Sequence, residues 1–388
     1  MKTATLALEN GQTFEGVSIG ADGETTGEVV FNTSLTGYQE VLTDPSYAGQ
    51  IVTMTAPQIG NYGVTREDCE SRKTSVAGFV VREASPMSSN WRAEDSFTNY
   101  LTTNGIVAIA EIDTRALTRV LRSAGVMRGV IATGDVSAKA LVEKAKASAK
   151  MEGADWVKAV TCEAPFDWTA ASAPQAAGVP AGPSDFIVPP THLSAGATRT
   201  IAAYDLGMKW NILRRFTNYG LNVRVYPATT PAEEVLATNP AGIFFSNGPG
   251  DPAALDYVGR NAKVAAESGV PVFGICLGHQ VLAMGLGGST YKLPFGHRGT
   301  NHPVKHLETG KIEITSQNHG FAVDPASLPK DVEVTHLNLY DNTVEGLKHK
   351  ELPVFCVQYH PEAAPGPHDA DYLFGMFLDS IDRKNGKN

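Results

Sequence analysis

The chain has 388 residues, of which 42 % are hydrophobic and 19 % are charged, and its formal net charge is −9. This length favours two domains, and the composition suits a globular protein with a substantial core. The negative balance argues against a nucleic-acid partner, which would need a basic face to displace counterions. No apolar run approaches the roughly 20 residues that a membrane helix needs. We therefore expect neither a nucleic-acid partner nor a membrane-bound protein.

The cysteines and the first residues bear on the compartment. Cys69, Cys162, Cys276 and Cys356 are widely spaced, and no pair of them forms a CxxC motif. In a chain of this length the pattern is typical of free thiols in a reducing compartment. The first residues reach Glu9 before an apolar segment of useful length builds up, so they do not resemble a targeting signal. The sequence thus predicts a cytoplasmic protein.

Residues 1–160 are expected to form a mixed α/β domain. Asn10-Gly11 lies between two short alternating runs, which is a strong signal for a β-hairpin. A helix is predicted between Asp113, a suitable N-cap, and Gly125, a suitable stop. The Ala- and Lys-rich run at 137–150 is typical of a surface helix. Further short strands are expected at 27–34, 50–57, 75–83 and 105–112.

A linker is expected at 161–198. This stretch is rich in Ala, Pro and Gly, and few helices or strands tolerate so many prolines.

Strand and helix patterns alternate regularly after the linker. Four strand–helix units follow one another, which predicts a doubly wound, mostly parallel sheet with helices on both faces. Ligands bind beyond the carboxyl ends of the strands in such folds. The motifs "SNGPGDP" (246–252) and "GICLGHQ" (274–280) both lie at such ends. The expected strands are 199–205, 221–228, 242–247 and 271–275, and the expected helices are 208–220, 230–239, 253–269 and 278–288.

Cys276 lies in a G-x-C-x-G pattern between Gly274 and Gly278. This is the cysteine form of the nucleophile elbow, in which a sharp strand-to-helix turn exposes the central side chain. The helix N-terminus then stabilises a thiolate, and the backbone N–H of Leu277 points to where an oxyanion would form. The alternative is a structural cysteine buried in a strand between glycines that pack closely.

A thiolate nucleophile needs a base, and the sequence offers ten histidines. His360 follows an apolar strand, and Glu362 two residues later could hold its imidazole in one tautomer. The alternative for His360 is a solvated histidine in a loop. His279 and His319 lie near glycine-containing turns and are further candidates.

Two other segments have weaker signals. His297, His302 and His306 could bind a metal ion, but their spacing fits no common zinc motif, so we favour a loop and predict no metal. The segment 246–252 lacks the lysine of a phosphate-binding loop. A turn that offers backbone N–H groups to an anion or oxyanion fits it better, and an ordinary loop is the alternative.

Three motifs in this order, "SNGPGDP", "GICLGHQ" and "YHPE" (359–362), resemble the class I, or triad, glutamine amidotransferases over residues 199–382. The flanking segments and the N-terminal half resemble the small, glutamine-hydrolysing chain of carbamoyl-phosphate synthase over essentially the whole sequence. The chain departs from that family in its long linker. It also departs at Met208-Lys209-Trp210, to which we attach no functional consequence.

The resemblance implies a role for individual residues. It makes Cys276 the nucleophile, His360 the base and Glu362 the carboxylate that orients the base. It also implies that the N-terminal half closes one side of the site and docks on a partner, with residues 199–388 as the amidotransferase domain. The residues that match glutamine-binding positions are Ser46, Gly248, Gly250, Leu277, Gln280, Asn318, Gly320 and Phe321.

By the same resemblance, the chain hydrolyses L-glutamine and passes ammonia to a large synthetase subunit. That subunit would make carbamoyl phosphate for arginine and pyrimidine biosynthesis, and it would hold the ATP, Mg and bicarbonate, leaving no cofactor in this chain. The alternatives are the glutaminase subunit of another amidotransferase complex, a non-catalytic partner module, and a stand-alone hydrolase.

Overall fold

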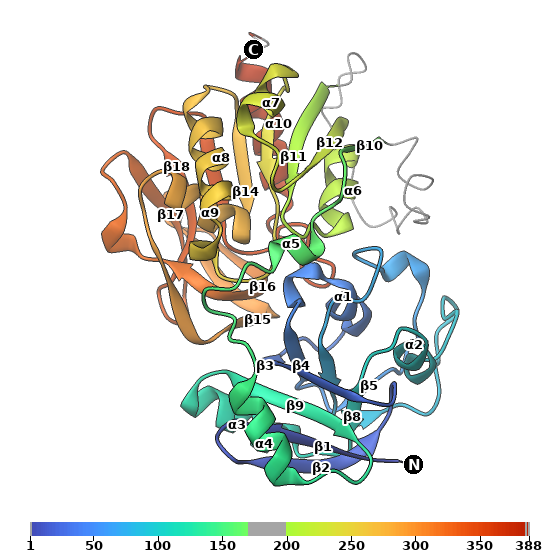
Figure 1. The fold of residues 1–388 in the computed structure, drawn as a ribbon. Coiled ribbons are helices and arrows are strands. Elements are labelled where there is room, and N and C mark those ends of the chain that lie inside the picture. Colours follow the sequence, from blue (N-terminus) through green and yellow to red (C-terminus); the bar gives the residue numbers. More distant parts are fainter. Residues whose placement is uncertain (1, 170–198, 385, 387–388) are drawn as a thin grey trace. The chain divides into compact units, whose positions relative to one another are not determined.

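The computed structural model describes residues 2–169, 199–384 and 386. The chain forms two compact units, residues 1–154 with 294–299, and residues 155–293 with 300–388 (Figure 1). Most of the expected linker, 170–198, lies outside the described residues.

The start of the expected linker differs from the prediction. Residues Phe166–Trp168 form strand β10, which pairs antiparallel with β12 (Leu221–Pro227). The Trp168 side chain is buried, so apolar burial and strand pairing order this short stretch although its composition resembles a linker.

A closed barrel is the main feature of the first unit. Its strands follow the order β1-β2-β8-β6-β4-β3-β9 around the ring, which leaves no free sheet edge. The predicted hairpin at Asn10-Gly11 is confirmed as the β1–β2 connection, where Gly11 has φ 96°. The barrel strands are β1 (Thr3–Leu8), β2 (Thr13–Ser18), β3 (Glu24–Asn32), β4 (Gln50–Met54), β6 (Gly78–Val80), β8 (Ala108–Ala110) and β9 (Met127–Thr133).

Helices pack around this barrel. The predicted helix α3 (Thr114–Ala124) starts as expected, because the Asp113 side chain accepts a hydrogen bond from the Ala116 N–H, 2.8 Å apart. The predicted surface helix α4 is confirmed, because Lys139 and Lys146 are exposed while Leu141 and Ala145 pack against the barrel wall. The other elements of this unit are α1 (Tyr38–Thr43), α2 (Phe97–Thr103), α4 (Ala138–Ala147), β5 (Gln58–Ile59), β7 (Glu83–Ala84), η1 (Pro45–Tyr47) and η2 (Arg66–Asp68).

The second unit is built on a ten-stranded sheet. The strands β12, β11, β13, β14 and β19 are neighbours in this order and all run parallel, which confirms the doubly wound prediction. In chain order this is the 2-1-3-4-5 arrangement, whose ligand site lies where the strand order reverses. An antiparallel wing of β18, β17, β15 and β16 extends the sheet beyond β19.

The bounds of the remaining elements complete this unit. The strands are β11 (Arg199–Asp205), β13 (Ile243–Phe245), β14 (Val272–Ile275), β15 (Thr290–His306), β16 (Ile312–Val323), β17 (Val332–Asn338), β18 (Val344–His349) and β19 (Val354–Val357). The helices are α5 (Val157–Val160), α6 (Trp210–Asn218), α7 (Ala232–Ala237), α8 (Asp256–Glu267), α9 (Leu277–Gly285), α10 (Tyr372–Lys384), η4 (Pro252–Ala254) and η5 (Pro325–Ser327).

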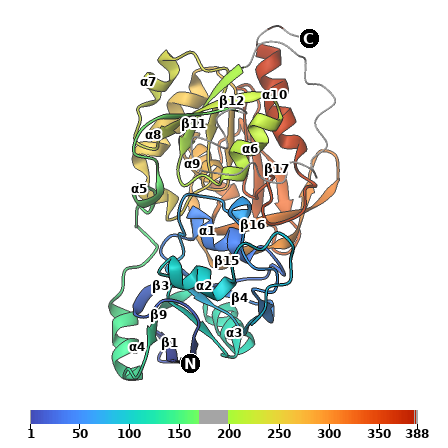
Figure 2. The same cartoon turned by 90° about the vertical axis from the view of Figure 1, so that its right-hand side faces the viewer.

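Helices cover both faces of the parallel strands, as the strand–helix alternation predicts. In Figure 2, α7 and α8 lie on one side of the sheet, and α6 and α10 lie on the other. Aromatic side chains hold the second side together, because Phe216 of α6 packs edge-on against Phe244, and Phe377 of α10 packs against Phe273. Aliphatic side chains of α8 and α9, such as Val258 and Val281, fill the first side. Both faces are therefore apolar, as parallel sheets require.

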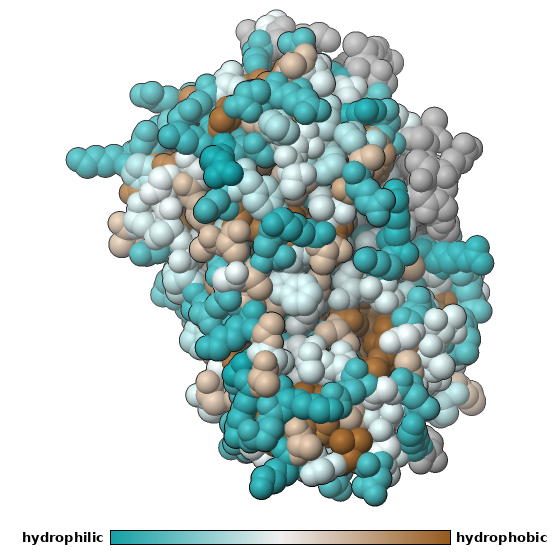
Figure 3. All heavy atoms as spheres, in the orientation of Figure 1, coloured by the Kyte–Doolittle hydropathy of each residue, from teal (hydrophilic) through white to brown (hydrophobic). Residues whose placement is uncertain are grey.

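The surface is largely hydrophilic on the face drawn in Figure 3, where apolar side chains gather only in small groups. Among the helices of the described residues, none combines the length and the hydropathy that a membrane span requires.

Helix α9 lies very close to strand β13 because of one glycine. A Cβ atom on Gly278 would lie only 2.0 Å from the backbone oxygen of Phe245. The atom that the added Cβ would meet belongs to the backbone of Phe245, so no side-chain rotation can relieve this contact. The close approach fixes where α9 begins, and thereby where Cys276 stands.

We expect Gly278→Ala to lower the free energy of unfolding by about 2–4 kcal/mol, because the added methyl group must push α9 away from the sheet. Gly259 provides a matched control in the neighbouring helix α8, since a Cβ there meets nothing within 4 Å. Gly259→Ala should leave stability unchanged or raise it by about 0.5–1 kcal/mol. Urea titration of both variants measures the difference, and equal stabilities would contradict the packing argument.

Candidate active site

Cys276 stands at the turn between β14 and α9. Its backbone has φ 55° and ψ −105°, a left-handed conformation that is strained for a residue with a side chain. Its N–H donates to the carbonyl of Val357 in β19, 2.9 Å away, so the neighbouring strand holds the strained residue in place. This is the geometry of a nucleophile elbow.

The glycines around Cys276 are required for two different reasons. A Cβ on Gly274 would lie 2.8 Å from the backbone of Gly278, so the tight turn itself excludes a side chain there. Gly278 is needed for the approach of α9 to β13 described above. The turn therefore requires Gly274, whereas Gly278 serves the packing of α9 on β13.

His360 and Glu362 form a buried pair beyond the end of β19. The Nδ1 atom of His360 donates to Oε1 of Glu362 across 2.7 Å, and the two side chains are 2 % and 0 % exposed. The backbone N–H of His360 donates to the carbonyl of Ser316 in β16, 2.9 Å away. His360 is thus a fixed, buried side chain, which rules out the alternative of a solvated loop histidine.

The protonation of His360 reflects its two neighbours. Burial alone would lower the pKa of this imidazole, but the Glu362 carboxylate, followed by Cys276, outweighs burial and raises the pKa to about 10. Among the described residues the His360 Nε2 atom has no partner within strict hydrogen-bond geometry. Cys276 nevertheless lies close enough to shift the pKa, and such contacts are often loose before substrate binds.

Lys209 is the residue of this site to which the sequence analysis assigned no role. Its Nζ atom lies 3.0 Å from Oε1 of Glu362 and donates to the carbonyl of Ala363 across 2.5 Å, and its side chain is 4 % exposed. Burial alone would raise the pKa of the Glu362 carboxyl, but Lys209, followed by His360, lowers it to about 2. Glu362 is therefore a buried carboxylate held between two cations.

Asn211 supports the same loop from the first turn of α6. Its Nδ2 atom donates to the carbonyl of Glu362 across 2.5 Å. The start of α6 thus binds both the backbone and the side chain of Glu362. The sequence does carry one signal for Lys209, because it follows the carboxyl end of the parallel strand β11, where such folds place their functional residues.

The "SNGPGDP" turn packs directly against the elbow. A Cβ on Gly248 would lie 2.1 Å from the carbonyl oxygen of Leu206 and 2.8 Å from the Leu277 side chain. Gly250 has φ 95°, which favours glycine. The structure thus places Gly248 against Leu277, the residue that follows Cys276.

The predicted residues of β16 also lie at this site. The Sγ atom of Cys276 is 3.5 Å from the carbonyl oxygen of Asn318, and Gly320 and Phe321 follow in the same strand. The side chain of Gln280, expected to face substrate, donates from Nε2 to the carbonyl of Phe321 (2.8 Å) and to Oε1 of Gln358 (3.0 Å). Its amide therefore ties α9 to strand β16 and to the residue that follows β19.

Ser46 belongs to the first unit. It lies in η1, where its N–H donates to Oδ1 of Asp44 (2.9 Å) and its carbonyl accepts from Nε2 of Gln50 (3.0 Å). Only 4 % of the residue is exposed. Its role in glutamine binding stays a prediction.

The other histidines considered as bases have different partners. The Nδ1 atom of His279 lies 3.2 Å from Sγ of Cys356, and burial lowers the pKa of His279 to about 3, so this imidazole is neutral. His319 donates from Nδ1 to the carbonyl of Phe321, 2.8 Å away. Both side chains are engaged within the core.

The loosely clustered histidines at 297, 302 and 306 are spread along the strand β15 and do not form a loop. Four residues of extended chain span about 13 Å, so His302 and His306 cannot bind the same ion. His302 lies beside Asn338 (Nδ1 to Nδ2, 3.4 Å), and the ring of His306 packs 4.5 Å from that of His336. Extended strand geometry is thus the reason that the loop interpretation is wrong, and it keeps His302 and His306 too far apart to share one metal ion.

A doubly wound sheet with a buried cysteine, histidine and glutamate at its strand ends is what class I glutamine amidotransferases are expected to show. Residues 202–380 match the family described as "Glutamine amidotransferase class-I", and the second unit is therefore a domain of this class. Residues 6–131 match "Carbamoyl-phosphate synthase small chain, CPSase domain".

Similar proteins cover nearly the whole chain. A carbamoyl phosphate synthase small chain of Syntrophotalea carbinolica is 52 % identical over 98 % of this chain and 98 % of its own length. Small chains of Rhodopirellula baltica (51 %, covering 99 % and 98 %) and Aquifex aeolicus (52 %, covering 97 % and 98 %) are comparably similar. The chain belongs to the carbamoyl phosphate synthase small chain family. Because residues 6–131 match the domain of the carbamoyl-phosphate synthase small chain, the alternative of an amidotransferase that serves another synthase is disfavoured.

We expect Lys209→Met to lower the free energy of unfolding by about 3–5 kcal/mol near neutral pH, because it leaves a buried carboxylate without its lysine. The stability that comes from a lowered carboxyl pKa is present above the ordinary value of 4.5 and is lost as pH falls towards about 2. The difference in the free energy of unfolding between the parent and Lys209→Met should therefore become smaller as the pH falls.

Denaturant titration at several pH values tests this expectation. Lys263→Met is the matched control, since Lys263 pairs with Glu267 at 4.0 Å on the surface and should contribute less than about 0.5 kcal/mol. If the difference in the free energy of unfolding between the parent and Lys209→Met stayed constant from pH 7 to pH 2, this would count against the pairing of Lys209 with Glu362.

The second expectation concerns the imidazole. Removing the charge of Glu362 takes away the largest influence that raises the pKa of His360, so Glu362→Gln should make His360 lose its proton at a clearly lower pH than about 10. Nitrogen NMR of the histidine-labelled chain measures this titration directly. Glu351→Gln, at an exposed glutamate, should leave it unchanged, and an unshifted His360 in Glu362→Gln would refute the pairing.

Proposed function

We propose that Cys276, His360 and Glu362 act together to hydrolyse L-glutamine to glutamate and ammonia. The observation that carries this proposal is the strained cysteine at the end of β14 beside a buried histidine that is hydrogen-bonded to a buried carboxylate. Each of the three has the position that a nucleophile, a base and an orienting group need. The family to which the chain belongs supports the choice of substrate.

The first half of the reaction is acyl transfer to sulfur. The Cys276 thiolate attacks the side-chain amide carbon of glutamine, and the backbone N–H groups of Leu277 and Gly248 stabilise the oxyanion. The protonated His360 gives its proton to the departing nitrogen. Ammonia leaves, and a γ-glutamyl thioester with Cys276 is formed.

The second half returns the enzyme to its starting state. His360, now neutral, removes a proton from a water molecule that attacks the thioester carbon. The tetrahedral intermediate collapses, the C–S bond breaks, and glutamate leaves while Cys276 is again a thiolate. Glu362 holds the imidazole in one orientation throughout, and Lys209 keeps Glu362 ionised.

The family resemblance supports the residues that we propose for substrate binding, and three of them are also supported by their proximity to the elbow. Gly248, Leu277 and Asn318 lie beside Cys276. For Gln280 we propose a positioning role, because its amide donates to Phe321 of β16 and to Gln358, the residue that follows β19. The full proposed set for glutamine is Ser46, Gly248, Gly250, Leu277, Gln280, Asn318, Gly320 and Phe321.

We further propose that the ammonia is delivered to a large synthetase chain. The relatives are named small chains of carbamoyl phosphate synthase and match this chain over nearly its whole length. The large chain would use the ammonia with bicarbonate and ATP, and would hold the nucleotide and its Mg. The proposed glutamine hydrolysis uses only protein groups and water, so it needs no cofactor in this chain.

We expect Cys276→Ser to abolish glutamate release from glutamine, since serine lacks a comparably nucleophilic anion at neutral pH. The assembled complex with its large chain should still make carbamoyl phosphate when ammonia is supplied directly. Both products can be measured on the same preparation, and Cys69→Ser serves as the control because Cys69 lies in the other unit. Glutamate release at the parent rate by Cys276→Ser would refute the proposed mechanism.

A further inference from the structure

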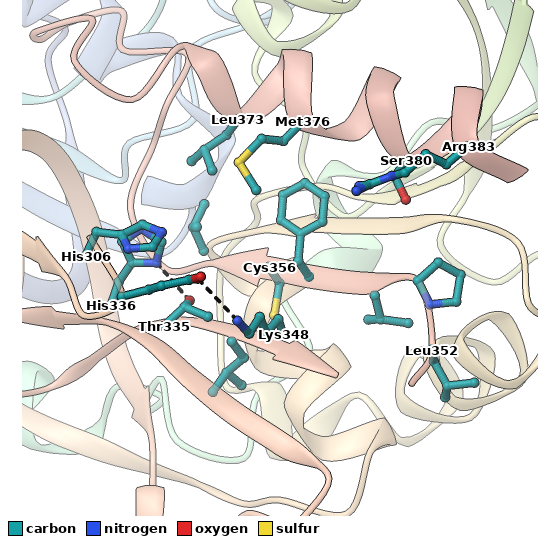
Figure 4. A pocket seen from close by; sticks show the side chains of 16 residues that line it. His306, Thr335, His336, Lys348, Leu352, Cys356, Leu373, Met376, Ser380 and Arg383 are labelled. Atoms are coloured by element: carbon teal, nitrogen blue, oxygen red, sulfur yellow. Dashed lines mark hydrogen bonds and ion pairs between the residues drawn. The ribbon is translucent and has the colours of Figure 1, made fainter. Parts of the chain in front are cut away.

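A pocket of about 210 Å³ lies in the second unit, and none of Cys276, His360 and Glu362 lines it. It opens between helix α10 and the sheet face formed by β17, β18 and β19 (Figure 4). The proposed glutamine hydrolysis makes no use of it. An engineered apolar cavity of about 150 Å³ binds benzene, so this space is large enough for a ring-sized ligand.

The pocket exists because α10 covers only part of the sheet. Phe377 of α10 packs over β14 and β19, where it contacts Phe273 and Phe355. Beyond β19 the same face continues with Lys348 of β18, which pairs with Phe355 in the strand register. Met376, on the exposed side of α10, closes the space from above. The walls near Phe355 and Met376 are therefore apolar.

A buried histidine lines one end of this pocket. His336 is 4 % exposed, and its Nε2 atom has no hydrogen-bond partner among the described residues. Its Nδ1 atom is already paired with the Thr335 hydroxyl, 2.8 Å away. Burial, together with the neighbouring His306 and His279, lowers the pKa of His336 to about 3, so the ring is neutral at physiological pH. A buried polar atom without a partner is costly, and a neutral ligand group can supply one.

A cation and a hydroxyl lie at the opposite end. Ser380 and Arg383, three residues apart on one face of α10, lie together and away from His306 and His336 in Figure 4. Arg383 has no ion pair within the described part of the chain, whereas Lys348 is already paired with Glu308 (3.4 Å) and Glu333 (3.5 Å). A guanidinium and a hydroxyl side by side suit a carboxylate.

We propose that this pocket binds a small aromatic carboxylate that has a neutral polar group at its far end. The carboxylate binds Arg383 and Ser380, the ring lies against Phe355 and Met376, and the far polar group bonds to His336. Each part of the ligand thereby matches one part of the pocket. The proposal does not depend on the function proposed for Cys276.

The pocket shares one strand with the candidate active site. Val357 of β19 lines the pocket, and its carbonyl accepts the Cys276 N–H. His336 also packs edge-on against Tyr359, the residue before His360, with ring centroids 5.7 Å apart. A test must therefore distinguish binding in the pocket from binding at Cys276.

The probe is para-hydroxyphenylacetate, and its neutral counterpart is para-hydroxyphenylacetamide. Titration of the full chain, followed by NMR, should show saturable binding of the acid with a Kd of about 1 mM or tighter. The amide should bind about tenfold more weakly, because it lacks the charge that Arg383 recognises. Absence of saturable binding by the acid would overturn the proposal.

Two variants and one matched control locate the bound acid. Arg383→Gln should weaken binding about tenfold, and Met376→Trp should abolish it by filling the space. Lys384→Gln, at the next residue of α10 and outside the pocket, should bind as the parent does. Equal weakening by Arg383→Gln and Lys384→Gln would show only general charge attraction and would refute the site.

Competition with glutamine completes the test. In the Cys276→Ser chain, saturating glutamine should leave the affinity for the acid unchanged within about twofold, since glutamine does not occupy the pocket. Displacement of the acid by glutamine would place it at Cys276 and overturn the proposal. If the parent chain showed no glutaminase activity, binding of the acid in the pocket would still stand. The proposal for the pocket and the proposal for Cys276 can therefore fail separately.

Discussion

The buried carboxylate of Glu362 is the charge on which the arrangement of the candidate site depends. Removing a carboxylate from water is costly unless cations and hydrogen bonds compensate it. Here Lys209 comes from the start of α6 and His360 from the same loop, and both bind the same oxygen atom. The ionised glutamate in turn keeps the pKa of His360 high. One interaction thus fixes the loop, the tautomer and the charge of the imidazole.

Backbone geometry places the cysteine against this charged group. Cys276 is strained, and the strain is tolerated because β19 accepts its N–H and Gly278 lets α9 lie against β13. Neither contact belongs to the turn itself. The elbow is therefore a property of three adjacent strands and one helix, and a change in the packing of any of them would move the sulfur atom relative to His360.

Strand β19 relates the two sites of this unit. Its end carries the chain into His360, its Val357 binds the backbone of Cys276, and its open face forms part of the second pocket. The pocket arises because α10 stops short of the antiparallel wing. The antiparallel strands thus add sheet surface that α10 does not cover. His336 of β17 lies on this surface, and Arg383 of α10 borders it.

Features encoded by contiguous residues could be predicted without the structure. Alternating strands and helices predicted the parallel sheet, and Gly274, Cys276 and Gly278 predicted the elbow, because a turn of this kind depends on residues that are neighbours in the chain. Asn10-Gly11 predicted its hairpin for the same reason. His360 and Glu362, two residues apart, were also within reach of a local argument.

Features that depend on residues far apart in the chain could be recognised only after folding had brought those residues together. The partner of Glu362 is Lys209, 153 residues away, and no periodicity points to such a pair. Closure of the first unit into a barrel depends on strand pairings across the whole unit, and the neutral state of His279 and His336 depends on burial by distant strands. Burial and long-range pairing set these charges, and both become visible only once the chain is folded.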